Sequence, residues 1–445
     1  MQKVVAVLGG GIGGLSACHH LSKSPNVSKI ILLEKSGRCG GWLSSIRRDD
    51  GAVFEQGPRG IYCFLVQVSE LGLESEILPV AKDHVASKNR FLYVTGQLGI
   101  IRTIPPFSRP IIQSVLKEIL IRKGREEDES VHAFLADVAI DSLCRGVFAG
   151  DSRRLSVRSC FPPLYVLGML MGSGGGPKIV PSDLAKRASK ESWTQWSLKR
   201  GTQAFPEVLE DMLKRRERVE LHHHAKVKSL NVIGGCWEIK LDEGISLKAD
   251  HVISTLPASE LASVLPPAAQ PLSEQLRSIT SVNVAVVNLE YEGFILPVTG
   301  FGHLVPSSED PGVLGVVYDS VPFPQHSRSG GLTTRLTVMM GGAWFVQMFG
   351  HPDSVTKQTL LDRATQAVTS HLGVNSQPVW SCAALHKNCI PQYHLGHWKR
   401  LEKMRQHISN HNLPLTLAGA SYDGVAVIDV VFSGWAAAEG LIGKT

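Results

Sequence analysis

Three glycines near the start of the chain, Gly9, Gly11 and Gly14, have the spacing G-x-G-x-x-G. In such a pattern the first glycine permits a tight turn, the second lets the backbone approach a pyrophosphate, and the third allows a helix to pack closely on a strand. Apolar residues fill positions 4–8, as in a buried strand, and recur at helical spacing over residues 15–21. Amides at the start of the helix would face the phosphate. The stretch therefore predicts a strand–turn–helix unit that binds a dinucleotide.

A carboxylate follows at the distance expected for a ribose contact. Residues 29–33 read as the next strand, and they end at Glu34, about 20 residues beyond Gly14. A carboxylate here can accept hydrogen bonds from the ribose hydroxyls, and no arginine stands beside it to accommodate a 2′-phosphate. These residues leave both NAD and FAD open.

Two further glycine turns favour FAD. Arg38, Gly40 and Gly41 form an R-x-G-G turn, and the sequence EQGPRG over residues 55–60 forms a third. Each could be an ordinary surface turn. In this order, however, they suit an extended FAD, which needs further close backbone approaches towards its ribityl and flavin end.

The remaining strand and helix signals predict that the dinucleotide-binding domain is assembled from both chain ends and from a central segment that rejoins it. A second strand–glycine–helix junction spans residues 415–427 and contains Gly419 and Gly424. A charged helix is expected over residues 207–218. Strands of the first sheet are expected at 219–221, 225–230 and 251–256, and strands of a separate antiparallel sheet at 282–291, 301–305 and 335–340. Residues 111–195 read as mainly helical.

Composition indicates an ordinary globular chain of two or three domains. The chain has 445 residues, of which 43% are hydrophobic and 19% charged, and its net charge is +6. The basic residues are scattered, which argues against nucleic-acid binding, although the mild excess suits an anionic small molecule or membrane surface. The eight cysteines are isolated and read as reduced thiols. His222, His223 and His224 are adjacent and would point in different directions, so a polar turn is expected rather than a ligand set, and no metal site is expected.

One uncharged segment raises the question of a membrane. The first residues already belong to the first strand, so we expect no cleavable presequence. No apolar run reaches about 18 residues, so a spanning helix is not expected. Residues 159–177 carry no charge but are interrupted by prolines and glycines. They could dip into one leaflet, line an apolar cavity, or simply pack in a core.

Several longer motifs carry a resemblance to a known family. They are VLGGGIGGLSAC, FEQGPRGI, NRFLYV, IDSLCRGVFAG, WTQWSL, GFGHLVPSSEDPGVLG, LHKNCIPQY and LAGASYDGVAV. With these motifs the chain resembles the protoporphyrinogen oxidases of the FAD-dependent amine-oxidase superfamily, in their animal mitochondrial form, over almost its whole length.

The resemblance implies an enzyme that binds one FAD and performs the oxygen-dependent, six-electron oxidation of protoporphyrinogen IX to protoporphyrin IX in haem biosynthesis, producing hydrogen peroxide. It also implies a homodimer bound peripherally to the mitochondrial inner membrane on its intermembrane-space side, with the next haem-pathway enzyme as a further partner. The implied fold is α/β (α+β overall). It has a Rossmann-like FAD-binding domain (1–62, 200–258 and 385–445), an interleaved antiparallel-sheet substrate domain (63–94 and 259–384) and a helical membrane-binding domain (95–199).

The resemblance also assigns residues to the site. No side chain is assigned as a catalytic acid or base, because the flavin carries the chemistry. Arg90 would pair with a substrate propionate, and Phe301, Leu304 and Met339 would contact the macrocycle. The cofactor contacts would be Gly9, Gly10, Gly11, Ile12, Gly13, Gly14, Glu34, Arg38, Trp42, Gly57, Pro58, Arg59, Gly60, Val227, Ala420, Val425, Ala426 and Val427. A surface arginine and core apolar residues are the alternative interpretation of the substrate set.

The sequence departs from the family pattern in two respects. Several loops are shorter, including those after Ile61 and Tyr93, and the region before Ile140 is abbreviated. In the last helix Ile428 replaces an Asn and Trp435 replaces an Arg. An Asn can hydrogen-bond to backbone or cofactor, and Ile cannot. Two alternatives therefore stay open: an impaired member that retains FAD or porphyrin binding, and a related flavin amine or polyene oxidase.

Overall fold

The computed structural model describes residues 2–61, 66–101, 138–161 and 182–443. The chain forms two compact units. The first unit contains residues 1–44, 202–280 and 396–445, and the second contains residues 45–201 and 281–395. Each is therefore assembled from separate stretches of sequence, as predicted for the dinucleotide-binding domain.

A parallel sheet is the framework of the first unit. Its strand order is β19-β13-β1-β2-β9, and all four pairings are parallel. The strands are β1 (Lys3–Leu8), β2 (Val27–Leu33), β9 (Val219–His222), β13 (His251–Ser254) and β19 (Leu415–Leu417). Val5 to Leu8 are fully buried, which explains the unbroken apolar run, because a parallel sheet is covered on both faces.

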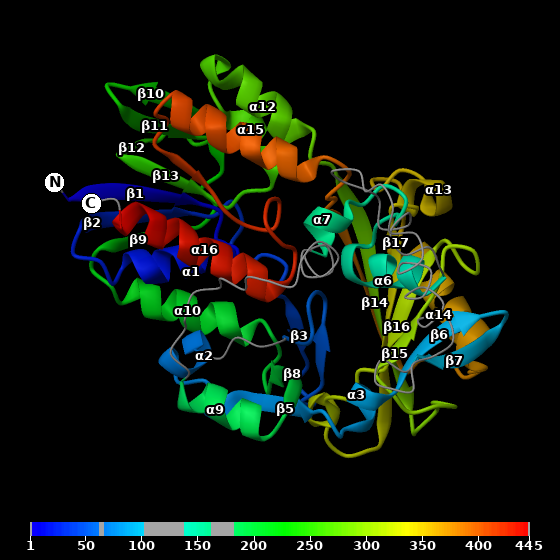
Figure 1. The fold of residues 1–445 in the computed structure, drawn as a ribbon. Helices are drawn as coiled ribbons and strands as arrows, with labels where there is room; N and C mark the ends of the chain where they lie inside the picture. The colour runs from blue at the N-terminus through cyan, green and yellow to red at the C-terminus, as the bar shows by residue number, and fades with distance from the viewer. Residues whose placement is uncertain (1, 62–65, 102–137, 162–181, 444–445) are drawn as a thin grey trace. The chain divides into compact units, whose positions relative to one another are not determined.

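Helices cover one face of this sheet and a small second sheet with further helices covers the other (Figure 1). On one side α16 (Val427–Ile442) and α10 (Ala204–Lys214) pack against α1 (Ile12–Leu21). On the other, Leu8 and Ile31 share a core with Trp237 and Met404. The elements there are β10 (Val227–Ile233), β11 (Cys236–Leu241), β12 (Ser246–Ala249), α11 (Ala258–Val264), α12 (Gln270–Arg277) and α15 (His397–Asn410).

Two expectations about this unit are corrected. The strand predicted over residues 225–230 does not join the first sheet, because β10 pairs antiparallel with β11. Residues 259–280, expected in the substrate domain, lie in the first unit. The reason is that Leu261, Leu272 and Leu276, from α11 and α12, are fully buried in the same core as Leu8.

A seven-stranded sheet is the framework of the second unit, with the order β18-β14-β17-β16-β15-β6-β7. Its pairings are antiparallel apart from the parallel pair β15–β6. The predicted antiparallel sheet is thus confirmed. The strands are β6 (Arg90–Val94), β7 (Gln97–Ile101), β14 (Ser281–Glu292), β15 (Gly302–Leu304), β16 (Val313–Val317), β17 (Thr333–Gly342) and β18 (Trp380–Pro391). Residues 45–62 and 385–395, expected in the FAD domain, belong here as far as they are described, because β18 and the strand β4 (Val53–Glu55) pair within this unit.

Shorter elements complete the second unit. Two-stranded sheets pair β3 (Ser45–Arg47) with β4 (Val53–Glu55), and β5 (Ile77–Ala81) with β8 (Trp193–Leu198). The helices are α2 (Val66–Glu70), α3 (Val85–Lys88), α6 (Val138–Phe148), α7 (Val157–Cys160), α9 (Asp183–Lys190), α13 (Phe345–Phe349) and α14 (Lys357–Leu372).

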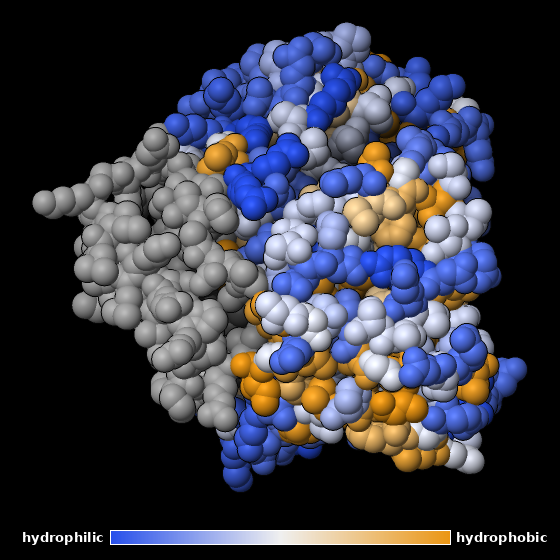
Figure 2. Space-filling model, turned by 90° about the vertical axis from the view of Figure 1, so that its right-hand side faces the viewer, coloured by the Kyte–Doolittle hydropathy of each residue, from blue (hydrophilic) through white to orange (hydrophobic). Residues whose placement is uncertain are grey.

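The expected membrane-binding domain (95–199) falls largely outside the described residues, as does most of the uncharged segment 159–177. Within the described part of that range, β7 and β8 are strands rather than helices. Among the helices that the structure describes, none has the length and apolar character needed to cross a bilayer. On the face drawn in Figure 2, apolar residues form separate patches among hydrophilic ones.

Candidate functional site

The first glycine turn has the geometry that its sequence predicts. Gly9 has a φ of +96°, which favours glycine. A Cβ on Gly14 would lie 1.9 Å from the carbonyl oxygen of Gly9, so only glycine lets α1 approach the end of β1 this closely. A Cβ on Gly11 would meet nothing within 4 Å. Gly11 is also the N-cap of α1 and offers no side-chain cap. The turn is therefore an open cradle at a helix N-terminus, which suits a phosphate.

Glu34 lies at the edge of this cradle. One of its carboxylate oxygens accepts a hydrogen bond from the amide of Gly10 (2.8 Å). The other accepts hydrogen bonds from the amide (2.8 Å) and hydroxyl (2.7 Å) of Ser36. These contacts hold the carboxylate beside the glycines, where it can accept ribose hydroxyls.

The R-x-G-G turn lies directly against the first turn. The amide of Gly40 donates to the carbonyl of Gly10 (2.8 Å), and a Cβ on Gly41 would lie 3.3 Å from the Cα of Gly11. The guanidinium of Arg38 donates to the carbonyl oxygens of Cys39, Gly41 and Leu43. In this structure, therefore, the contacts of Arg38 close its own turn.

The two later segments of the predicted cofactor set reach the same end of the sheet. The amide of Ala225 donates to the carbonyl of Glu34 (2.8 Å), which places the segment leading to Val227 beside the ribose position. A Cβ on Gly13 would lie 3.9 Å from the Cα of Gly419, so the C-terminal junction before Ala420 lies against the first turn. Trp42 is 44% exposed. The structure thus places the first glycine turn, Glu34, the R-x-G-G turn and the segments at Ala225 and Gly419 around one end of this sheet.

Sequence reasoning missed two hydroxyl side chains that organise this end. Thr255 follows β13, and its hydroxyl lies 2.9 Å from the carbonyl oxygens of both Leu8 and Gly9. Ser433 of α16 accepts a hydrogen bond from the amide of Gly419 (2.8 Å). Neither residue has a local sequence signal, because each acts on a segment far away along the chain.

Residues 57–60 of the predicted cofactor set lie in the second unit. A Cβ on Gly60 would lie 2.7 Å from Oε1 of Gln195, so a close approach requires glycine there. Arg59 is 8% exposed and donates from Nη1 to Asp319 (2.9 Å). Its Nη2 is buried, and none of the described residues is hydrogen-bonded to it. A buried donor of this kind retains the capacity to bind a polar ligand atom.

The predicted substrate residues lie in the seven-stranded sheet of the second unit: Arg90 on β6, Phe301 directly before β15, Leu304 on β15 and Met339 on β17. The guanidinium of Arg90, at the start of β6, lies 5.6 Å from the ring centroid of Phe301, and its Nε is buried without a partner. Leu304 and Met339 are both register partners of Gly315. Directly paired residues point to the same face of a sheet, so Leu304 and Met339 share one face. Arg90 with Phe301 thus forms one group, and Leu304 with Met339 forms a second.

A buried arginine fixes the loop that follows Leu304, and sequence analysis did not identify it. Arg145, on α6, donates to the carbonyl oxygens of Val305 (2.9 Å), Asp310 (2.9 Å), Pro311 (3.2 Å) and Val313 (2.7 Å). It has no exposed surface, and burial lowers its pKa to about 10. One buried cation therefore binds four backbone carbonyl oxygens in and at the end of the loop from β15 to β16.

The opposite side of β15 carries a buried histidine pair. His303 contacts Tyr318 (Nδ1 to Oη, 2.9 Å) and His371 (Nε2 to Nδ1, 3.1 Å). Burial, with a smaller contribution from His371, lowers the pKa of His303 to about 3. Burial also lowers the pKa of His371 to about 4, against the opposing field of Asp310. Both imidazoles are thus neutral near pH 7.

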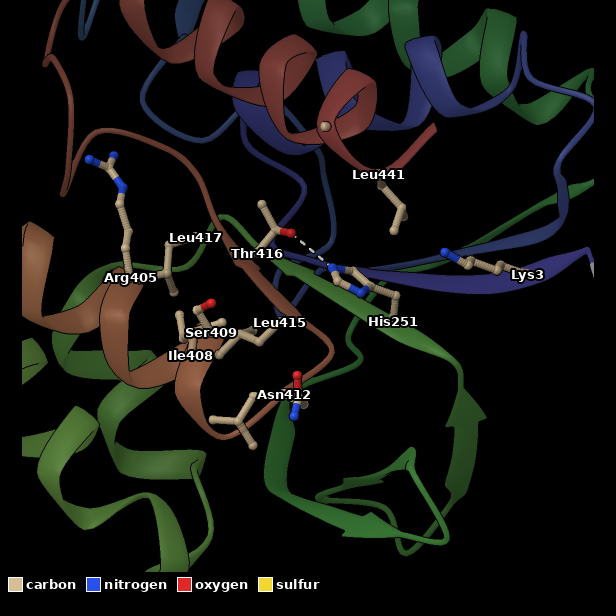
Figure 3. A pocket seen from close by; sticks show the side chains of 12 residues that line it. Lys3, His251, Arg405, Ile408, Ser409, Asn412, Leu415, Thr416, Leu417 and Leu441 are labelled. Carbon is tan, nitrogen blue, oxygen red and sulfur yellow. Dashed lines mark hydrogen bonds between the residues drawn. The ribbon is translucent and has the colours of Figure 1, made fainter. Parts of the chain in front are cut away.

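The hollow drawn in Figure 3 is not part of the predicted site. It has a volume of about 650 Å³ and lies in the first unit, at the starts of β1 and β13, where Lys3 and His251 stand. His251 is hydrogen-bonded to Thr416 across it (2.8 Å). The glycine turns follow the opposite, carboxyl ends of these strands, which is where open α/β sheets bind ligands.

The residues present fit a flavin dinucleotide. The first unit supplies an open glycine cradle at Gly11, a carboxylate at Glu34 and a second close backbone approach at Gly40 and Gly41. A nicotinamide dinucleotide would need no second glycine turn, whereas an extended FAD does.

Comparisons with known proteins identify the class. Residues 7–67 match an NAD(P)-binding Rossmann-like domain, and residues 112–442 match the flavin containing amine oxidoreductases. These regions cover most of the chain and define an FAD-dependent oxidoreductase.

The similar proteins are more specific. The protoporphyrinogen oxidase of Homo sapiens is 48% identical, with 100% of this chain and 99% of that protein covered. The one of Bos taurus is 47% identical with the same coverage. The coproporphyrinogen III oxidase of Bacillus subtilis is 26% identical over 98% of this chain and 97% of its own length. The chain therefore belongs to the flavin containing amine oxidoreductases and, within them, to the protoporphyrinogen oxidase family.

Solved structures show the same fold. A crystal structure from Exiguobacterium sp. 255-15 is 22% identical, covers 100% of both chains and has a TM-score of 0.79. Reduced UDP-galactopyranose mutase is 14% identical, with 100% of this chain and 96% of that chain covered and a TM-score of 0.74. At these identities the likeness concerns the fold alone.

Proposed function

We propose that this chain catalyses the oxygen-dependent oxidation of protoporphyrinogen IX to protoporphyrin IX, with release of hydrogen peroxide, in haem biosynthesis. The observation that carries the proposal is the 48% identity to the Homo sapiens protoporphyrinogen oxidase over the full chain. The open cradle at Gly11 and the carboxylate of Glu34 support it, because they suit the required cofactor.

The substrate residues have the chemistry that a dianionic tetrapyrrole requires. Arg90 has a guanidinium whose Nε has no hydrogen-bond partner among the residues that the structure describes, and arginine can bind a propionate in a bidentate manner. Phe301 packs beside it, while Leu304 and Met339 offer apolar contact on one sheet face. Arg90 would thus orient the substrate, and the apolar residues would exclude water from the macrocycle.

The division of labour follows from these side chains. Bound FAD supplies the two-electron redox chemistry that side chains cannot provide, and oxygen accepts the electrons afterwards. The chain itself binds and orients FAD and the porphyrinogen substrate. Arg145 contributes indirectly, because it holds the loop that leaves β15 just after Leu304.

We further propose a peripheral, monotopic association with the intermembrane-space side of the mitochondrial inner membrane, as a homodimer, with the next haem-pathway enzyme as a partner. The net charge of +6 and the uncharged segment 159–177 support attachment to an anionic membrane surface. Flotation of the purified protein with cardiolipin-containing vesicles tests the membrane part. Recovery only in the soluble fraction would refute it.

The decisive experiment measures porphyrin fluorescence with FAD content quantified in the same sample. Protoporphyrinogen IX and coproporphyrinogen III should be offered in parallel under air and under nitrogen. We expect porphyrin formation from the first substrate, in air, with one FAD per chain. Preference for coproporphyrinogen III would reassign the substrate.

One specific observation favours a second candidate. Ile428 and Trp435 replace the expected polar residues in the last helix, and the alignment to the Homo sapiens protein spans 477 positions against 445 residues here, so this chain has shorter loops. A member that binds FAD but forms no porphyrin would fit these departures. That outcome in the same assay would establish an impaired family member.

A further inference from the structure

A mixed group of potential metal ligands lies beside the ribose end of the cofactor site. Cys39, Glu210 and His223 each offer one ligand atom, and these atoms all lie within 4.8 Å of one another. Among the residues that the structure describes, this is the one group of three or more such side chains that could hold an ion. Its members come from the R-x-G-G turn, from α10 and from the residue after β9, so only the fold brings them together.

The three side chains are shielded from solvent. Cys39 is 5% exposed and Glu210 is 9% exposed, and the side chain of His223 is 24% exposed. His223 contacts Glu210 through Nε2 (2.9 Å), while its Nδ1 is buried and has no hydrogen-bond partner in the described part of the chain. The imidazole of His223 thus lies against the Glu210 carboxylate and can offer a ring nitrogen to an ion.

We propose that Cys39, His223 and Glu210 form a site for a borderline or soft divalent cation, with Zn²⁺ as the best match. Thiolate, imidazole and carboxylate are the three ligand types that Zn²⁺ accepts, and a water can complete a tetrahedral set. Ligand atoms of such a site lie about 3.5 Å apart, so the side chains need to close by about 1 Å. The step exchanges one ion for one proton: the sulfur–hydrogen bond of Cys39 breaks, a metal–sulfur bond forms, and the proton leaves to water.

Two features of the metal-free site oppose this exchange and so define how it must be tested. Burial, with added repulsion from Glu210 and Glu34, raises the pKa of the Cys39 thiol. The ammonium of Lys214 occupies one oxygen of Glu210 (2.7 Å). This oxygen, Oε1, is the one that His223 also contacts. Lys214 is half exposed and can turn to water, so an ion that binds Oε1 displaces it. Removing this ammonium should therefore strengthen metal binding.

The position links the ion to the first glycine turn. Cys39 directly precedes Gly40, whose amide donates to the carbonyl of Gly10. A Cβ on Gly10 would lie 2.8 Å from the sulfur of Cys39 and 3.1 Å from Oε2 of Glu34. A bound ion would therefore tie the R-x-G-G turn to α10 and stiffen the wall of the ribose position.

The test uses the FAD-loaded protein after removal of metals with a chelator. Zn²⁺ is titrated by calorimetry, and Co²⁺ is added to a parallel sample to detect the ultraviolet charge-transfer band of a cobalt–thiolate bond. We expect one equivalent of Zn²⁺, a thiolate band with Co²⁺, and a rise in the thermal unfolding midpoint with Zn²⁺. Cys39→Ser and His223→Gln should each raise the Kd for Zn²⁺ by more than about 10-fold and abolish the thermal shift.

Matched controls come from neighbouring residues of the same types. His222→Gln and Cys236→Ser should bind Zn²⁺ as the wild type does, and Lys214→Met should bind it more tightly. Absence of a stoichiometric equivalent, or an equivalent that survives in Cys39→Ser and His223→Gln, would overturn the proposal. Equal loss in His222→Gln would overturn it too, since that pattern indicates a surface histidine run. If Lys214→Met binds Zn²⁺ as the wild type does or more weakly, Glu210 is not a ligand, and the three-ligand site is refuted.

Discussion

Two glycines of the first turn should respond to the same substitution in opposite ways. Gly11 has an extended backbone with φ −65° and ψ 174°, which alanine adopts without strain, and its Cβ would meet no protein atom within 4 Å. Gly14 lies inside α1, and its Cβ would lie 1.9 Å from the carbonyl oxygen of Gly9. Gly11→Ala should therefore leave the apoprotein intact and impair FAD binding, whereas Gly14→Ala should damage the apoprotein itself.

The magnitudes follow from these contacts. In Gly14→Ala the helix must retreat from β1 by about 1 Å, and such overpacking costs about 3 kcal/mol of unfolding free energy. In Gly11→Ala the new methyl group occupies the phosphate approach. Holding a phosphate away from the amides of a helix N-terminus removes charge-assisted hydrogen bonds worth about 3 kcal/mol, which corresponds to a Kd for FAD raised about 100-fold.

Two measurements on flavin-free protein separate the effects. Denaturant unfolding followed by circular dichroism reports the stability of the apoprotein, and quenching of flavin fluorescence reports the Kd for FAD. We expect Gly11→Ala to unfold within about 0.5 kcal/mol of the wild type yet bind FAD weakly. Wild-type affinity in Gly11→Ala, or wild-type stability in apo Gly14→Ala, would refute the assignment of this turn as the phosphate cradle.

Three further substitutions test the second unit. Arg90→Gln should raise KM for protoporphyrinogen about 10- to 100-fold with a smaller change in kcat, because a charge-assisted pair is worth about 1.5–3 kcal/mol; Michaelis curves with Arg90→Lys as the milder variant check this. Arg145→Met should lower the unfolding free energy by about 4 kcal/mol, since four carbonyl oxygens lose a buried cation; denaturant titration measures the loss, and wild-type stability would contradict it. The lowered pKa of His303, about 3, means that the unfolded chain takes up its proton below pH 6.5 while the folded chain does not, so stability is full above pH 6.5 and falls towards pH 3. His303→Gln should reduce that slope by about 1.4 kcal/mol per pH unit between pH 4 and 6, and an unchanged slope would show that His371 or other groups control it.

The parts of this molecule that sequence analysis predicted are those that depend on neighbours along the chain. The turn at Gly9, Gly11 and Gly14 needs only a strand before it and a helix after it, so its pattern is local and its prediction is confirmed by the Rossmann-like match. The R-x-G-G turn was likewise found from Arg38, Gly40 and Gly41. What local patterns could not provide was the contact between the two turns, which rests on a hydrogen bond from Gly40 to Gly10.

The residues that sequence analysis missed act across long separations. Arg145 donates hydrogen bonds to carbonyl oxygens about 160 to 168 residues away in the sequence. The hydroxyl of Thr255 is hydrogen-bonded to the carbonyl oxygen of Leu8, 247 residues away. The sheet to which residues 227–233 belong was predicted wrongly for the same reason. This short strand carries no local signal for one sheet or the other, and only its pairing with β11 decides. His223 gains its possible ligand role from Cys39 and Glu210, and not from its histidine neighbours.

The altered last helix can be judged by what its other residues still hold. The hydroxyl of Ser16, on α1, donates to the carbonyl of Val431 (2.8 Å). A Cβ on Gly434 would lie 2.1 Å from the carbonyl oxygen of Gly13, so α16 and α1 approach as closely as backbones can. The docking of α16 on the phosphate turn thus depends on small residues and a hydroxyl, none of which is among the departures.

The two replaced positions lie on other surfaces of that helix. The ring of Trp435 lies 4.9 Å from that of Phe432 and 6.3 Å from that of His20, where α16 meets the far end of α1. Ile428 lies in the first turn of α16, where the carboxylate of Asp429 accepts a hydrogen bond from the amide of Ala426 (3.2 Å), so the start of the helix retains a polar cap without the missing Asn. The departures therefore remove one potential polar contact at Ile428 and leave the helix packing intact. If this chain has lost activity, we expect the cause to lie in the shortened loops rather than in a loosened FAD site.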